Sequence, residues 1–212
     1  MPIGNCVYLD FLLSRVMQFK INYIFLSLYY NHELFLDYLK VTDYTDYIEP
    51  IIEPEPLGTG GAINYVIENT TISSPFFVIN GDSISNINLN QMLKKFDDAN
   101  MKSMVGISRV DEATRYGTVL ENDGEVVSFK EKGLNGAGWI NNGHYIFKKE
   151  AFDEFNGIFS LENDLFPKLL QKKELGAFRV ANDNFIDMGI PEEYLKLNKR
   201  SFINYEDEKN NT

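Results

Sequence analysis

Two aspartates have the side-chain type and the position expected of residues that hold a metal ion and phosphates. Asp82 follows the apolar run 76–79, and ligands of open parallel sheets bind at the carboxyl ends of strands. Asp187 lies too early to cap the helix that Pro191 is expected to start. If the fold brings them together, two carboxylates can share Mg²⁺ with substrate phosphates, as is common in phosphoryl chemistry. The alternative for Asp82 is a polar turn, because Gly81 and its neighbours are common turn formers.

A glycine-rich segment, Leu57-Gly58-Thr59-Gly60-Gly61, lies between a predicted strand and a predicted helix. Three glycines in four residues let backbone N–H groups approach an anion closely at a helix N-terminus. The alternative is an ordinary strand-to-helix turn with Thr59 as the N-cap. A cap needs at most one glycine, so the other two favour a binding loop.

A third group of polar residues follows the predicted strand 126–130. Glu131 can accept hydrogen bonds from sugar hydroxyls, and Lys132 can neutralise a phosphate. A charged strand edge is the alternative for Lys130 and Lys132. Three further residues are candidate substrate contacts or, alternatively, parts of turns and a first-turn helix acid: Tyr116, Gly117 and Glu162.

Composition excludes several function classes. Hydrophobic residues make up 44% and charged residues 24%, which is typical of a folded protein. A net charge of −11 with no basic stripe disfavours nucleic-acid binding. The single Cys6 and two histidines exclude a disulfide framework and disfavour a Cys- or His-based metal site, which leaves oxygen ligands. No targeting signal or membrane span is visible, so we expect a reduced, cytoplasmic protein.

The hydrophobic pattern predicts one α/β domain over residues 1–200 and a polar tail over 201–212. Helices are expected at residues 7–19, 33–40, 62–68, 89–96, 150–155, 161–171 and 191–199. Strands are expected at residues 24–28, 47–52, 76–79, 103–110, 117–121, 126–130 and 139–147. The early strands are apolar throughout, which indicates a parallel sheet with helices on both faces. Turns separate the later strands, which indicates an antiparallel section and therefore a mixed, mainly parallel sheet.

Taken in order, these motifs resemble the sugar-1-phosphate nucleotidyltransferases. The similarity is strongest to the short bacterial branch that acts on mannose 1-phosphate or D-glycero-D-manno-heptose 1-phosphate. The matching segments are residues 55–63, Val78-Ile79-Asn80-Gly81-Asp82, Tyr116-Gly117, Phe129-Lys130-Glu131-Lys132, Asn142-Gly143 and Phe185-Ile186-Asp187-Met188-Gly189. The resemblance implies a Rossmann-like α/β fold whose antiparallel section binds the sugar.

The resemblance also implies a role for each matching residue. The residues implied to bind the nucleotide are Leu57, Gly58, Thr59, Gly60, Gly81 and Asp82. The residues implied to line the sugar-phosphate pocket are Tyr116, Gly117, Glu131, Lys132, Asn142, Gly143 and Glu162. Asp82 and Asp187 are implied to bind Mg²⁺ and, with Lys132, to be catalytic. The sugar-phosphate oxygen would then attack the α-phosphorus of the triphosphate and expel pyrophosphate.

Members of this family begin with a strand, a Gly-Gly-x-Gly-Thr-Arg-Leu loop and a Lys-Pro-Met segment, whereas this chain begins just after the equivalent of that segment. The family's first strand lies in the middle of the sheet, so we expect its two neighbours to have an unpaired edge. The loop cradles the triphosphate, so without it we expect impaired catalysis. The competing expectation is a true start roughly 20–25 residues upstream, enough for a strand and a loop.

Three functions remain open at this point. The first is a nucleotidyltransferase that joins heptose or mannose 1-phosphate to a nucleoside triphosphate, with GTP favoured by the resemblance alone. The second is a glycosyltransferase that uses a nucleotide sugar, with Asp82 as its metal ligand. The third is a non-catalytic remnant that binds a nucleotide or a sugar phosphate. No nucleic-acid or membrane partner is expected, and a homo-oligomer is left open.

Overall fold

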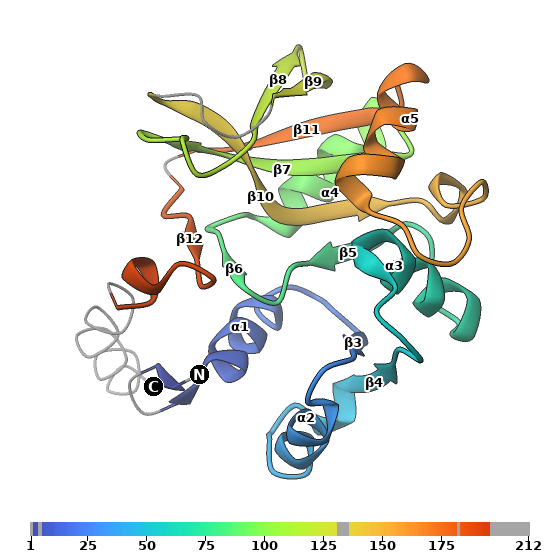
Figure 1. The fold of residues 1–212 in the computed structure, drawn as a ribbon, viewed down its shortest axis with the longest axis vertical. Helices are drawn as coiled ribbons and strands as arrows, with labels where there is room; N and C mark the ends of the chain where they lie inside the picture. Colours follow the sequence, from blue (N-terminus) through green and yellow to red (C-terminus); the bar gives the residue numbers. More distant parts are fainter. Residues whose placement is uncertain (1, 4–5, 131–135, 182, 196–212) are drawn as a thin grey trace.

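The chain folds around one six-stranded mixed sheet with helices packed against it (Figure 1). The computed structural model describes residues 2–3, 6–130, 136–181 and 183–195. The strand order of this sheet is β5-β10-β7-β11-β9-β8. Its strands are β5 (Phe76–Ile79), β7 (Ser103–Val110), β8 (Thr118–Asn122), β9 (Glu125–Lys130), β10 (Gly138–Phe147) and β11 (Leu175–Val180).

The two central strands bury side chains on both faces of the sheet. In β7, Met104 belongs to one apolar cluster and Val105 to the other, and Ile146 and Phe147 alternate in the same way in β10. All four side chains are fully buried, as the strand period of two requires in a covered sheet. One face is covered by α4 (Leu89–Ala99), and the other by α3 (Gly58–Asn69), a π-helical turn (Leu161–Leu165) and α5 (Phe166–Gln171).

A smaller parallel sheet joins β3 (Ile24–Leu28) to β4 (Ile48–Ile52). Three helical segments accompany it: α1 (Tyr8–Val16), α2 (His32–Leu39) and a 3-10 turn (Thr45–Tyr47). Within the described residues β3 pairs only with β4 and β5 pairs only with β10. Among the described residues both strands therefore have an unpaired edge.

Two short antiparallel ladders complete the described strands. β1 (Pro2–Ile3) pairs with β2 (Cys6–Val7), and β6 (Ser83–Ile84) pairs with β12 (Ile186–Asp187). The second ladder lies between the large sheet and α1 in Figure 1. Within the described residues, no helix is both long enough and apolar enough to cross a membrane.

The mixed α/β class is confirmed, but some elements differ from those predicted. The sequence predicted a mainly parallel sheet. Among the described strands of the large sheet, however, only β7 and β11 are parallel neighbours. The predicted helix at 150–155 is wrong, since only a 3-10 turn (Lys149–Ala151) forms there. The predicted helix at 161–171 is split into a π-helical turn and α5. β11 was not predicted from the sequence, and α3 begins four residues earlier than expected.

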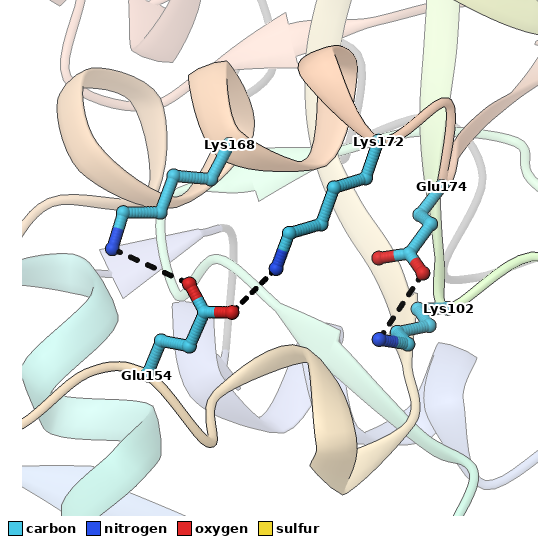
Figure 2. A network of polar contacts seen from close by, with 5 residues as sticks. All are labelled: Lys102, Glu154, Lys168, Lys172 and Glu174. Carbon is cyan, nitrogen blue, oxygen red and sulfur yellow. Dashed lines mark hydrogen bonds and ion pairs between the residues drawn. The ribbon is translucent and has the colours of Figure 1, made fainter.

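Ion pairs connect α5 to the loop before the π-helical turn at the surface. Glu154 lies 2.5 Å from the Nζ atom of Lys172 and 3.7 Å from that of Lys168, and Lys102 pairs with Glu174 at 3.1 Å (Figure 2). The hydrogen bond from Lys172 lowers the pKa of the Glu154 carboxyl. Glu154, Lys168 and Lys172 are about half exposed, so solvent and salt screen their ion pairs, whose contribution to stability is small.

Candidate functional site

The β6–β12 ladder brings the two predicted aspartates together. Asp187 pairs directly with Ser83, the residue that follows Asp82. The backbone N–H of Met188 donates to the carbonyl oxygen of Asp82 at 2.8 Å, which extends the ladder past both aspartates. Asp82 is exposed and Asp187 half-buried, so solvent reaches both residues.

Two tyrosines lie next to this pair of carboxylates. Burial is the main cause that raises the pKa of Tyr8, and the charges of Asp82 and Asp187 raise it further. Burial, followed by the charge of Asp187, raises the pKa of Tyr116 to about 12. The buried Tyr8 hydroxyl has no hydrogen-bond partner in the described structure. Both phenols are therefore neutral at physiological pH and can act as hydrogen-bond donors.

The donor set fits a divalent cation that arrives with phosphates. One oxygen of Asp187 accepts from the N–H of Gly189 at 2.8 Å, and one of Asp82 accepts from the Ser83 hydroxyl at 3.2 Å. Each carboxylate thus keeps oxygen lone pairs for a metal. Across the described ranges, no cluster of three or more His, Cys, Asp or Glu side chains could enclose a metal ion. Mg²⁺ in such sites keeps one or two carboxylates and takes its other ligands from phosphates and water.

The glycine-rich segment forms the first turn of α3 instead of a loop before it. Leu57 precedes the helix, and Gly58 already belongs to it with a φ of 73°. The N–H groups of Gly60 and Gly61 both donate to the carbonyl of Phe159, at 3.0 and 3.2 Å. These two amides are therefore occupied, and the predicted role of this turn in nucleotide binding stays a prediction.

Close packing accounts for the glycines in this turn. A Cβ atom on Gly60 would lie 2.2 Å from the ring of Phe159, and one on Gly61 would lie 2.3 Å from the carbonyl oxygen of Gly157. Thr59 contributes a further contact, because its hydroxyl accepts from the N–H of Leu161 at 2.9 Å. The turn thus holds residues 157–161 in place, and Glu162 follows directly.

Asn141 reaches toward Glu162, whereas the predicted Asn142 does not. The Asn141 amide donates to the Tyr145 hydroxyl at 2.9 Å and to Glu162 at 3.5 Å. Asn142 is fully buried, and its amide donates to Ser108 at 2.9 Å. Asn141 was not predicted as a site residue, although it directly precedes Asn142 in the sequence. Asn142 therefore lies buried behind Asn141, and its predicted role in sugar-phosphate binding stays a prediction.

Gly143 has a left-handed backbone at a bulge in β10. Its φ is 76°, and the register with β7 shifts between Asn141 and Tyr145. A Cβ atom there would lie 2.9 Å from Cβ of Asn80, whose N–H donates to the Gly143 carbonyl at 2.8 Å. Gly143 therefore lets β10 approach the turn that carries Gly81 and Asp82.

The remaining candidates divide into two groups. The ring of Tyr116 makes an edge contact with Phe185, two residues before Asp187, at 5.8 Å between centroids. Gly117 lies against β9, because a Cβ atom on it would be 3.1 Å from the Lys130 carbonyl oxygen. Glu131 and Lys132 lie outside the described residues, so their predicted roles stay predictions.

We expect His144 to make stability depend on pH between about 6.5 and 4. Burial lowers its pKa from 6.5 to about 4, with Asp183 and Arg15 acting in opposite directions on it. In this window the unfolded chain binds a proton that the folded chain does not. Stability should therefore fall by about 3 kcal/mol as the pH drops through it.

Urea unfolding between pH 7 and 4.5 measures this dependence. His144→Gln should flatten the curve over this range, since glutamine does not titrate. A variant whose curve keeps the wild-type slope would show that other groups cause the pH dependence.

Comparisons with known proteins show which family the chain resembles over nearly its whole length. The sequence model described as nucleotidyl transferase matches residues 1–202. The D-glycero-alpha-D-manno-heptose 1-phosphate guanylyltransferase of Aneurinibacillus thermoaerophilus is 35% identical over 201 residues, which cover 93% of this chain and 86% of that protein. The enzyme of the same name from Campylobacter jejuni is 32% identical, covering 91% and 85%. The crystal structure of HddC from Yersinia pseudotuberculosis, complexed with GMP-PN, superposes with a TM-score of 0.83 at 31% identity, covering 94% of this chain and 88% of that one.

Proposed function

Because the chain belongs to the nucleotidyl transferase family, we propose that it joins a sugar 1-phosphate to GTP and releases pyrophosphate. D-glycero-α-D-manno-heptose 1-phosphate is the favoured sugar, since two relatives that cover most of the chain are named for it. Mannose 1-phosphate is the second candidate, from the sequence resemblance. The reaction forms a bond from the sugar-phosphate oxygen to the α-phosphorus of GTP and breaks the bond to the β-phosphate oxygen.

The closeness of Asp82 to Asp187 at the β6–β12 ladder carries this proposal. Two carboxylates at the end of one short ladder, each accepting a hydrogen bond from a neighbouring residue, suit a metal-bound triphosphate. Enzymes of the family typically use a divalent metal, and we propose Mg²⁺ here. The ion would offset negative charge at the reacting phosphates. We propose that the neutral hydroxyl of Tyr116, next to Asp187, donates to a phosphate or sugar oxygen.

The sugar is proposed to bind beside Glu162 and Asn141. Glu162 is exposed on the π-helical turn and can accept from sugar hydroxyls, while Asn141 orients it from β10. Glu131 and Lys132 follow β9 in the sequence, and we propose that Lys132 neutralises the sugar phosphate. Positioning and charge stabilisation supply most of the acceleration in this kind of transfer, so no nucleophilic side chain is needed.

A pyrophosphate-release assay tests the proposal. Purified protein with Mg²⁺ is given GTP, ATP, CTP or UTP in combination with heptose, mannose or glucose 1-phosphate. The highest kcat/KM is expected for GTP with the heptose. Release with another base or sugar would correct the substrate, whereas saturable GTP binding without release from any pair would identify a binding protein.

A further inference from the structure

A buried polar network lies behind the β6–β12 ladder and centres on Asp183. Its carboxylate accepts from the hydroxyl of Ser85 at 2.6 Å, from the N–H of Asn86 at 2.6 Å and from the hydroxyl of Ser108. Ser85 is 4% exposed and Ser108 is fully buried. Asp183 is half-buried, and its carboxylate accepts from three donors. Among the hydrogen bonds of the described residues, this is the largest number for an acidic side chain near the site.

The network has a single consistent direction of donation. The amide of Asn142 donates to Ser85 at 3.3 Å and to Ser108 at 2.9 Å. Each hydroxyl has one proton, which it donates to Asp183 while it accepts from Asn142. An ionised carboxylate only accepts, so it terminates both chains without conflict. A neutral side chain of the same size, such as that of asparagine, cannot accept hydrogen bonds at both of the positions that the two carboxylate oxygens of Asp183 occupy.

Asp183 lies just before β12 and accepts hydrogen bonds from residues just after β6. Asp82 and Asp187 lie at the opposite end of the same two strands. It precedes Asp187 by four residues, and its partners Ser85 and Asn86 follow Asp82 by three and four. The ladder between them has only two residue pairs, which is too short to be stable by itself. A slip of one residue would turn Asp187 to the opposite face of the ladder.

Arg15 of α1 holds the same segment from the other side. Its guanidinium donates to the carbonyl of Ser85 at 2.9 Å and to the side-chain oxygen of Asn86 at 3.0 Å. Residues 85–86 are thus fixed between a helix and Asp183. The segment is anchored even though the ladder is short.

We propose that Asp183 is a positioning residue that fixes the register of β6 against β12 and so keeps Asp82 and Asp187 in place to share one metal ion. The role in the metal site rests on the proposed function. The role in the register does not, because it follows from the hydrogen bonds of the free protein.

Amide hydrogen exchange of the free protein tests the register without metal or substrate. Asp183→Asn must place an NH₂ group against either the Asn86 N–H or the two serine hydroxyls. We expect the Met188 N–H, which donates to Asp82, to exchange about 10-fold faster or more, because charge-assisted hydrogen bonds are lost. Asp98→Asn removes the same charge from an exposed position on α4 and should leave this rate unchanged. Equal rates in Asp183→Asn and the wild type would overturn the proposal.

Direct Mn²⁺ binding in the presence of GTP tests the metal role. Asp183→Asn should raise the Kd for Mn²⁺ about 10-fold, and higher metal concentrations should restore its turnover but not that of Asp82→Asn. Faster exchange with an unchanged Kd would overturn the link to the metal. A wild type that binds no Mn²⁺ would overturn the proposed function, while the exchange rates would still decide the register role. If Asp183→Asn does not fold, Ser108→Ala removes a single donor and takes its place in both measurements.

Discussion

Asp82→Asn is expected to lower kcat for pyrophosphate release by on the order of 10³-fold or more while the protein stays folded. The substitution removes one of the two charges at the end of the β6–β12 ladder. It keeps an oxygen that can accept from Ser83, and the backbone carbonyl still accepts from Met188. The loss should therefore appear in turnover and metal affinity, with circular dichroism and the melting temperature close to the wild type.

Asp187→Asn tests the second half of the same pair. Its side-chain oxygen can still accept from Gly189, so the turn that follows β12 should persist. We expect a loss similar to that of Asp82→Asn, and a double variant that is little worse than either, because residues that act as a unit are not additive. Asp98→Asn is the matched control for the lost charge. A loss of less than 10-fold in Asp82→Asn would contradict the two-aspartate site.

The fold was predictable wherever a strand is a continuous apolar run. β3 and β5 have the bounds expected from the sequence, since Phe76–Ile79 is apolar throughout and Ile24–Leu28 is apolar except for Ser27. β11 was missed because Gly176 and Arg179 interrupt its pattern, and only pairing with β7 makes it a buried inner strand.

Long-range packing decided the elements that sequence reasoning assigned wrongly. Residues 150–155 have helical spacing of apolar residues, but Phe152 instead packs against Phe76 and Phe147 beyond a 3-10 turn. The ring of Phe155 stacks on Phe159 at 4.7 Å. Tertiary contacts of this kind override a weak local preference, and a local pattern does not encode them.

The site was predictable in its residue types but not in its details. Asp82 and Asp187 were singled out by position, but their meeting depends on a two-residue ladder that has no sequence pattern of its own. Asn141 and Asn142 are equivalent in the sequence, and the bulge at Gly143 decides which one faces Glu162. Asp183 has no motif, and only its three donors reveal it.

Gly61→Ala is expected to destabilise the fold by about 1–3 kcal/mol and to lower kcat/KM, although alanine is the better helix former. The added Cβ would lie 2.3 Å from the carbonyl oxygen of Gly157 and 3.0 Å from Cβ of Leu57. A backbone carbonyl cannot rotate away as a side-chain end can, so residues 157–161 must shift. Glu162 follows directly, which is why substrate affinity should fall together with stability.

Urea unfolding and pyrophosphate release measure both effects of Gly61→Ala. Gly81→Ala is the matched control for stability, because a Cβ atom there would meet nothing within 4 Å. In an exposed helix interior Gly→Ala would stabilise the fold by roughly 0.8–1.0 kcal/mol. The sign of the change in unfolding free energy therefore shows whether Gly61 is needed for close packing or for ligand binding. A Gly61→Ala protein at least as stable as the wild type would show that α3 does not need the close approach of residues 157–161. The glycine-rich turn would then be explained by ligand binding instead of packing.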